Sequence, residues 1–212
     1  MATAMRNTLL VLGVLLLAFS TWEGAVQASD PEPITDFEVP PWVNISTLDG
    51  NYFTYTGFRG GVSVKPGQVD YKVATINDFP ALYGLGISFY LMYFQPGGVL
   101  PPHIHPRGSK LIYIIQGTLS VGFIDSNYKN YNQTLIEGDV YVVPKAMVHY
   151  MANLDSDVEV KVIFSFSSSN PGTILIPQAL FGSVPNIPDA VLENSFKVSG
   201  DVISHLKAPF SN

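Results

Sequence analysis

The chain has 212 residues, of which 47% are hydrophobic and 13% are charged, a composition typical of a single globular domain and not of a disordered chain. Its net charge of -6, with 11 Lys and Arg residues and no basic run, argues against a surface for nucleic acid or for anionic membrane. It contains no cysteine, so its stability has to come from its core and not from disulfides.

The first 28 residues are predicted to be a secretory signal peptide. Arg6 supplies the positive start, Leu9–Phe19 is an apolar run that is short for a bilayer span, and Val26–Ala28 offers small residues for cleavage. We expect cleavage after Ala28, a mature chain that starts near Ser29, and secretion to the extracellular space. The other interpretation of this segment is a membrane anchor.

The next part of the chain, from Ser29 to about Gly60, is expected to form an arm on the body of the protein, because its prolines keep it extended or turned. In a secreted protein the sequons at Asn44 and Asn132 are candidate glycosylation sites, and both lie in turn-like surroundings.

Strand patterns dominate from about residue 61 to residue 170. They predict strands over 62–64 and 86–94, a buried strand over 111–115 that ends in a hairpin at Gln116-Gly117, a polar turn over 125–132, and a strand, proline turn and strand over 138–153. The segment 158–167 alternates, and its predicted buried face is Val158, Val160, Val162, Phe164 and Phe166. Short strands between Gly and Pro turns indicate an all-β antiparallel sandwich or barrel of the jelly-roll kind.

The end of the chain, over 171–212, is predicted to be a helical extension with helices over 189–198 and 201–207. Val202, Ile203 and Leu206 form an apolar stripe on the second helix, which we expect to pack on a neighbouring subunit. His205 lies on the same helix and is interpreted as an ordinary helix residue.

Three of the four histidines lie beside strands. His103 and His105 are two residues apart, so in an extended chain their side chains leave the same face, with the spacing needed to share a metal ion. Taken alone, the pair can equally be two loop histidines beside prolines. His149 occurs in a second strand and turn setting of the same kind, and a cluster of the three would face the interior of the barrel.

Two segments resemble the signature boxes of the germins and germin-like proteins, plant members of the cupin superfamily. The first is Gly97–Arg107, and the second is Gly138-x5-Pro144-x4-His149-x3-Asn153. The segments 29–31, 170–172 and 179–183 also resemble the family, so nearly the whole mature chain is covered. The resemblance implies a cupin β-jelly-roll barrel with a C-terminal helical extension, an apoplastic glycoprotein, and a homohexamer built as a trimer of dimers.

The resemblance also implies a metal site. In the family Mn²⁺ is typically held by three histidines and a glutamate, and the histidines correspond to His103, His105 and His149. The position of the glutamate is Lys110 in this chain. An ammonium group there would repel the ion, so we expect Mn²⁺ to bind poorly.

Four further positions differ from the family pattern. Tyr90 and Leu100 stand where oxalate-oxidising germins have asparagines that contact substrate, which argues against oxalate oxidase activity. Glu38 stands where the first cysteine of the usual pair would fall, and Ala146 replaces a glycine of the second box.

Three states of the site remain open at this stage. Lys110 can swing to solvent and leave a three-histidine site that suits Zn²⁺, Cu²⁺ or Fe²⁺ better than Mn²⁺. It can stay inside as a neutral amine and fill a metal-free pocket. It can also take part in a site for a small anion.

These observations lead to one main hypothesis and two alternatives. The main hypothesis is a secreted germin-like cupin with an altered manganese site and a defence-related or cell-wall role, with no catalytic residue assigned. The alternatives are a metal-dependent oxidoreductase of the superoxide dismutase type and a storage-type cupin that serves as a nutrient reservoir.

Overall fold

The computed structural model describes residues 34–60, 62, 65–154 and 157–211. The predicted signal peptide, its cleavage site after Ala28 and the segment 29–31 lie outside these residues, as do two of the three residues of the predicted strand over 62–64. No helix in the described ranges has the length and apolar content needed to cross a bilayer.

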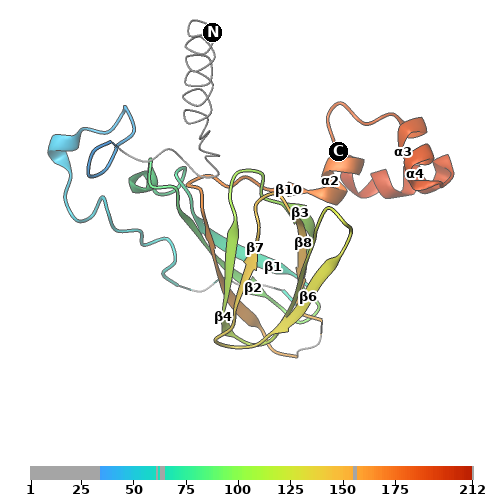
Figure 1. Ribbon diagram of the computed structural model, residues 1–212, viewed down its shortest axis with the longest axis horizontal. Helices are drawn as coiled ribbons and strands as arrows, with labels where there is room; N and C mark the ends of the chain where they lie inside the picture. Colours follow the sequence, from blue (N-terminus) through green and yellow to red (C-terminus); the bar gives the residue numbers. More distant parts are fainter. Residues whose placement is uncertain (1–33, 61, 63–64, 155–156, 212) are drawn as a thin grey trace, which may run out of the picture.

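Two five-stranded antiparallel sheets face each other and form the barrel in the centre of Figure 1. The first sheet has the order β1 (Val69–Ala74), β2 (Ser88–Phe94), β9 (Val160–Phe166), β4 (Lys110–Gln116) and β7 (Val140–Val143). The second has the order β10 (Ile174–Leu175), β3 (Val99–Ile104), β8 (Val148–Ala152), β5 (Leu119–Ile124) and β6 (Asn130–Leu135). The predicted jelly-roll barrel is thereby confirmed.

The core lies between the sheets, because alternate residues of central strands such as β4 and β9 point inward. In β9 the four predicted residues from Val160 to Phe166 are all buried. The prediction for Val158 was wrong, since that side chain is 56% exposed. It precedes the strand, and its carbonyl accepts a hydrogen bond from Asn153 Nδ2, which holds this residue in the connection between β8 and β9.

Strand β4 is buried on one face only, so the prediction of a buried strand over 111–115 was wrong for two of its five residues. Ile112 and Ile114 are fully buried, whereas Leu111 and Tyr113 are 47% and 44% exposed. The alternation arises because only the inner face of this sheet meets the second sheet.

The hairpin of β5 and β6 corrects a third prediction. The polar segment expected as a turn over 125–132 is a turn only as far as Lys129, and Asn132 lies inside β6, paired with Gly122. The polar residues pointed to a turn, but β6 is an edge strand with an exposed face, and such a strand tolerates them.

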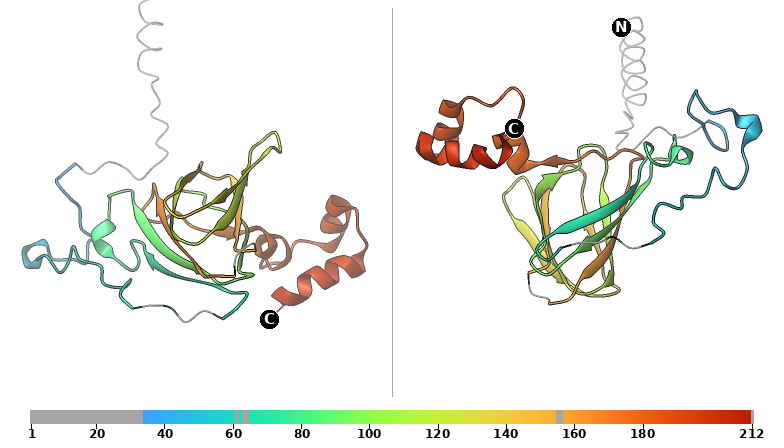
Figure 2. Two further views of the ribbon diagram at one scale, coloured as in Figure 1. Left: turned by 90° about the horizontal axis from the view of Figure 1, so that it is seen from below. Right: turned by 180° about the vertical axis from the view of Figure 1, so that it is seen from behind.

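The arm and the helices lie on opposite sides of the barrel (Figures 1 and 2). Residues 34–60 form the blue arm, which includes η1 (Ile45–Thr47) and is joined to β1 by the hydrogen bond from the Tyr55 hydroxyl to the Val73 carbonyl. The predicted helical extension contains α2 (Ile176–Phe181), α3 (Asp189–Phe196), α4 (Gly200–Lys207) and η3 (Ala208–Phe210), while η2 (Pro80–Leu82) precedes β2.

Candidate metal centre

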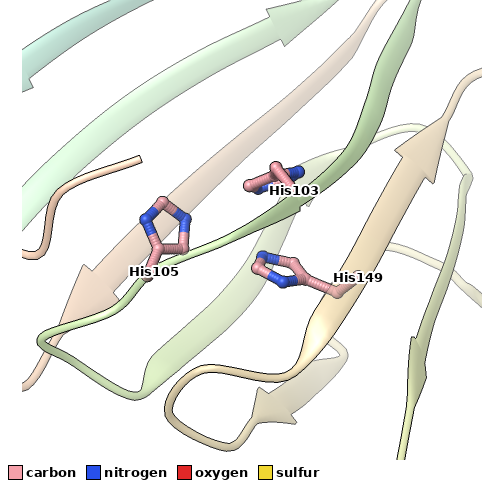
Figure 3. Close-up of side chains that lie close together, drawn as sticks. All are labelled: His103, His105 and His149. Atoms are coloured by element: carbon pink, nitrogen blue, oxygen red, sulfur yellow. The ribbon is translucent and has the colours of Figure 1, made fainter. Parts of the chain in front are cut away.

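Strands β3 and β8 bring the three histidines together inside the barrel. His103 and His149 are direct partners in the antiparallel register, and their ring centroids are 4.0 Å apart. His105 follows the end of β3, and its ring lies 5.1 Å from that of His103 and 5.3 Å from that of His149. Figure 3 shows the three rings converging, and one ligand atom from each lies within 4.8 Å of the others.

Backbone carbonyls fix the orientation of each imidazole. The Nδ1 atoms of His103, His105 and His149 lie at hydrogen-bond distance from the carbonyl oxygens of Pro101, Gly172 and Met147. A carbonyl oxygen only accepts, so each Nδ1 carries the proton and each Nε2 keeps its lone pair. This arrangement orients metal-binding histidines in many proteins.

Two of these lone pairs have no partner among the described residues. His103 and His105 are 1% and 4% exposed, and their Nε2 atoms meet no hydrogen-bond donor among the described residues. Buried nitrogens without partners are costly, and a ligand that supplied a metal ion or a donor would satisfy them. The cluster is therefore built to receive a ligand.

Lys110 enters the same site from the first residue of β4. Its side chain is 1% exposed, and its Nζ atom lies 3.3 Å from His149 Nε2 and 3.9 Å from the ring centroid of Phe164. Met151 Sδ is 4.0 Å from the same Nζ atom. The sequence left three states of Lys110 open. The structure does not adopt the one in which the side chain points to solvent.

Burial disfavours the charged forms of the side chains in this cluster. Desolvation, with a smaller contribution from Lys110, lowers the pKa of His103 and His105 to about 3 and that of His149 to about 2. Desolvation also lowers the pKa of Lys110 well below its ordinary value. No carboxylate among the described residues pairs with Lys110, so no negative charge offsets the loss of hydration.

These shifts predict acid destabilisation. The unfolded chain takes up protons on its histidines below a pH of about 6.5, whereas the folded cluster takes them up only near pH 3. The free energy of unfolding should therefore fall as the pH drops from 6.5 toward 3, by up to about 1.4 kcal/mol per pH unit for each histidine. Urea unfolding at a series of pH values measures this slope.

Two variants test whether the buried histidines cause this dependence of stability on pH. His149→Phe should make it shallower, while a change at the exposed His205, such as His205→Ala, should leave it unaltered. A slope that is the same in His149→Phe as in the wild type would contradict the assignment. Lys110 is the other titratable group in contact with the cluster, and its pKa is also lowered on folding. Between pH 6.5 and pH 3 it therefore either adds to the fall in the free energy of unfolding or has no effect on it.

The loop over 170–172 positions His105. Arg107 donates from Nε to the Asn170 carbonyl and from Nη2 to the Asn170 side chain, and the Gly172 carbonyl accepts from His105. Gly172 has a φ of +67°, and a Cβ there would lie 2.7 Å from Arg107 Nη2. Only glycine combines this backbone conformation with so close an approach.

Gly172→Ala is accordingly expected to destabilise the protein by roughly 1–3 kcal/mol and to disturb the ring of His105. Gly67→Ala is the matched control, since Gly67 has a similar φ of +78° with open space around its Cβ position. Thermal unfolding of both variants separates the effect of the clash with Arg107 from that of backbone strain. An equal loss of stability in the two variants would argue against the clash. Ala146, at φ +63°, already carries strain of this kind.

The residues fit a divalent ion only in part. Three converging imidazole nitrogens suit a borderline ion such as Zn²⁺, Cu²⁺ or Fe²⁺. They do not fit Mn²⁺, which favours hard anionic oxygen, because the fourth side chain at the cluster is the amine of Lys110. No carboxylate joins the three histidines within the described ranges.

A cavity of about 510 Å³ leads from the cluster to the protein surface, lined in part by Tyr90 and Leu100, the two positions that the family resemblance aligned with asparagines. Sequence reasoning missed several of its other walls, because they come from β1, from the turn after it and from the segment after β9, and carry no motif: Tyr71, Val73, Thr75, Asp78, Thr173 and Leu175. Strand alternation alone could have placed Tyr71 and Val73 on one face of β1.

Comparisons with known proteins agree with this geometry. The family model described as Cupin matches residues 59–204. Germin-like protein 9-1 of Oryza sativa subsp. japonica is 42% identical over 198 residues, which cover 92% of this chain and 78% of that protein. Germin-like protein 9-3 of the same organism is 37% identical over 210 residues, with 96% of each chain covered.

Among solved structures, oxalate oxidase in complex with the substrate analogue glycolate superposes with a TM-score of 0.81. Its sequence is 29% identical, and the match covers 86% of this chain and 98% of that one. The family match, the relatives and the barrel agree, and the chain belongs to the germin-like proteins of the cupin family.

Proposed function

We propose that this chain is a secreted, oligomeric germin-like protein of the apoplast that binds a ligand in its barrel and does not carry out manganese-dependent oxidation. The observation that supports this proposal is the amine of Lys110, buried 3.3 Å from His149 Nε2. An ammonium beside three imidazoles repels a divalent ion, and a neutral amine supplies no negative charge to stabilise Mn²⁺. A defence-related or cell-wall role is consistent with binding.

Secretion follows from the signal-like segment over 1–28, and the mature protein is then one cupin domain over 29–212. Its two sequons are accessible for glycosylation, since the side chains of Asn44 and Asn132 are both exposed. Asn44 precedes η1, and Asn132 lies on the outer edge strand β6, where a glycan would extend into solvent.

Exposed apolar faces support a homohexamer built as a trimer of dimers. On the outer face of β4 and β7, Leu111 is the partner of Val142 and Tyr113 is the partner of Val140, and all four side chains are exposed. The helices expose a second set: Val191, Phe196, Val202 and Leu206. Faces of this kind on a secreted protein are typical of subunit contacts.

Elemental analysis and activity assays on the purified, secreted protein test the proposal. We expect far less than one Mn per chain and neither oxalate oxidase nor superoxide dismutase activity. About one Mn per chain, with either activity, would contradict it. Mass photometry on the same sample reports the oligomer, and a population of monomers alone would argue against the hexamer.

The second candidate is a metal-dependent oxidoreductase of the superoxide dismutase type. The unpartnered Nε2 atoms of His103 and His105, beside His149, favour it because they can hold Cu²⁺ or Fe²⁺ without a carboxylate. A redox-active ion held there would supply one-electron chemistry. About one Cu or Fe per chain in the elemental analysis would favour this candidate over the first.

A further inference from the structure

The cavity above the histidines has the size and lining of a small-molecule site. Its volume of about 510 Å³ falls within the usual range of about 300–1,000 Å³ for such sites. The buried end carries His103, His105 and Lys110, whereas Tyr71, Asp78 and other exposed residues form the opening.

The buried end offers hydrogen-bond acceptors and a donor side by side. The Nε2 atoms of His103 and His105 are acceptors, because the Nδ1 atom of each ring is bonded to a carbonyl. Lys110 Nζ is a donor whether or not it carries a charge. A ligand group that both donates and accepts is required to satisfy both kinds of atom.

The sides of the cavity are apolar and aromatic. Tyr71 and Tyr90 stack with ring centroids 6.5 Å apart and an interplanar angle of 14°, and they face the space together with Met92, Leu100 and Phe164. Among the described residues that line the cavity, the one carboxylate is that of Asp78, at the exposed end. The walls therefore suit a flat aromatic ring.

We infer that the cavity binds a small aromatic molecule that carries a hydroxyl group, with the hydroxyl at the buried end. The hydroxyl donates to an imidazole Nε2 and accepts from Lys110 Nζ, while the ring packs between the walls. A carboxylate is acceptor-only and cannot satisfy the imidazole lone pairs, so it fits less well. This inference rests on the proposed function, since a metal ion bound by the same Nε2 atoms would displace the hydroxyl.

Calorimetric titration of the purified, secreted protein, treated with a chelator, with three matched probes tests the ligand class. The probes are para-cresol, toluene, which lacks the hydroxyl, and para-toluate, which replaces it with a carboxylate. We expect para-cresol to bind about tenfold or more tightly than either, as the loss of a buried hydrogen bond predicts. Equal binding of toluene would overturn the role of the polar end, and tighter binding of para-toluate would make the cavity an anion site.

Two variants test the position of the ligand. Lys110→Met should weaken para-cresol about tenfold and leave toluene unchanged, whereas Lys161→Met, a change on the outward-facing side of β9, should affect neither. Leu100→Trp should narrow the cavity and weaken the binding of all the probes, and it tests the site even where Lys110→Met fails to fold. Undiminished para-cresol binding in Leu100→Trp would overturn the location.

A parallel Mn²⁺ titration separates this inference from the proposed function. Tight, stoichiometric Mn²⁺ binding by the wild type contradicts the proposed function. Weak Mn²⁺ binding without any para-cresol binding overturns the ligand inference alone and leaves the proposed function intact.

Discussion

Lys110→Glu is expected to convert a weak Mn²⁺ site into a strong one, with an affinity at least about two orders of magnitude above that of the wild type. The three imidazoles already converge, and the substitution replaces an amine 3.3 Å from one of them with a hard anionic ligand. At an effective dielectric of about 20 and a separation of about 4 Å, one unit charge and a divalent ion interact by roughly 8 kcal/mol. A small part of this interaction energy is enough for the expected gain in affinity, because about 1.4 kcal/mol corresponds to a factor of ten in the binding constant.

Calorimetric titration of metal-stripped proteins with Mn²⁺ and Zn²⁺ measures the effect. Lys110→Met removes the amine without adding a carboxylate. Its Mn²⁺ affinity should therefore lie between those of the wild type and Lys110→Glu. His149→Ala should abolish binding in either background. Mn²⁺ bound as tightly by the wild type as by Lys110→Glu would show that Lys110 does not oppose the ion, and the oxidoreductase reading would then be the better one.

Lys110→Met is expected to stabilise the metal-free protein at pH 7 by about 1–4 kcal/mol, the range found when buried charged groups are replaced by apolar residues of similar volume. Lys110 is fully buried and its pKa is lowered well below the ordinary value, so folding costs the free energy needed to remove its charge. Methionine has a similar length and fills the same space beside Phe164 and Met151 without that cost.

The lowered pKa of Lys110 also determines how wild-type stability should change with pH. Because the pKa of Lys110 is lower in the folded state, the unfolded chain binds more protons between that pKa and about 10.4, and wild-type stability should rise with pH in that range. Lys110→Met should lack this rise. Chemical unfolding at pH 7 and pH 9 tests both statements, with Lys161→Met expected within about 0.5 kcal/mol of the wild type. A destabilised Lys110→Met would show that the contacts with His149 and Phe164 outweigh the cost of burial.

The corrections to the predicted elements have local physical causes. Val158 continued the alternation of β9 in the sequence, but Asn153 bonds to its carbonyl and keeps it outside the strand. Asn130 and Asn132 resembled turn residues because they are polar, yet the register with β5 places them in an edge strand. Neither the Asn153 bond nor the partner strand is visible in the local sequence pattern.

By itself the sequence determined the jelly-roll class, several strands of the barrel and the three histidines, because strand alternation and the His-x-His spacing are local properties of the chain. It left the state of Lys110 open among three possibilities. Only the tertiary structure decided that the amine points inward, since this depends on β7 and β9 flanking β4 and on β8 supplying His149 from 39 residues away. The cavity was likewise decided by β1, β2 and the segment after β9 meeting at one end of the barrel, a pairing of distant residues that no sequence period encodes.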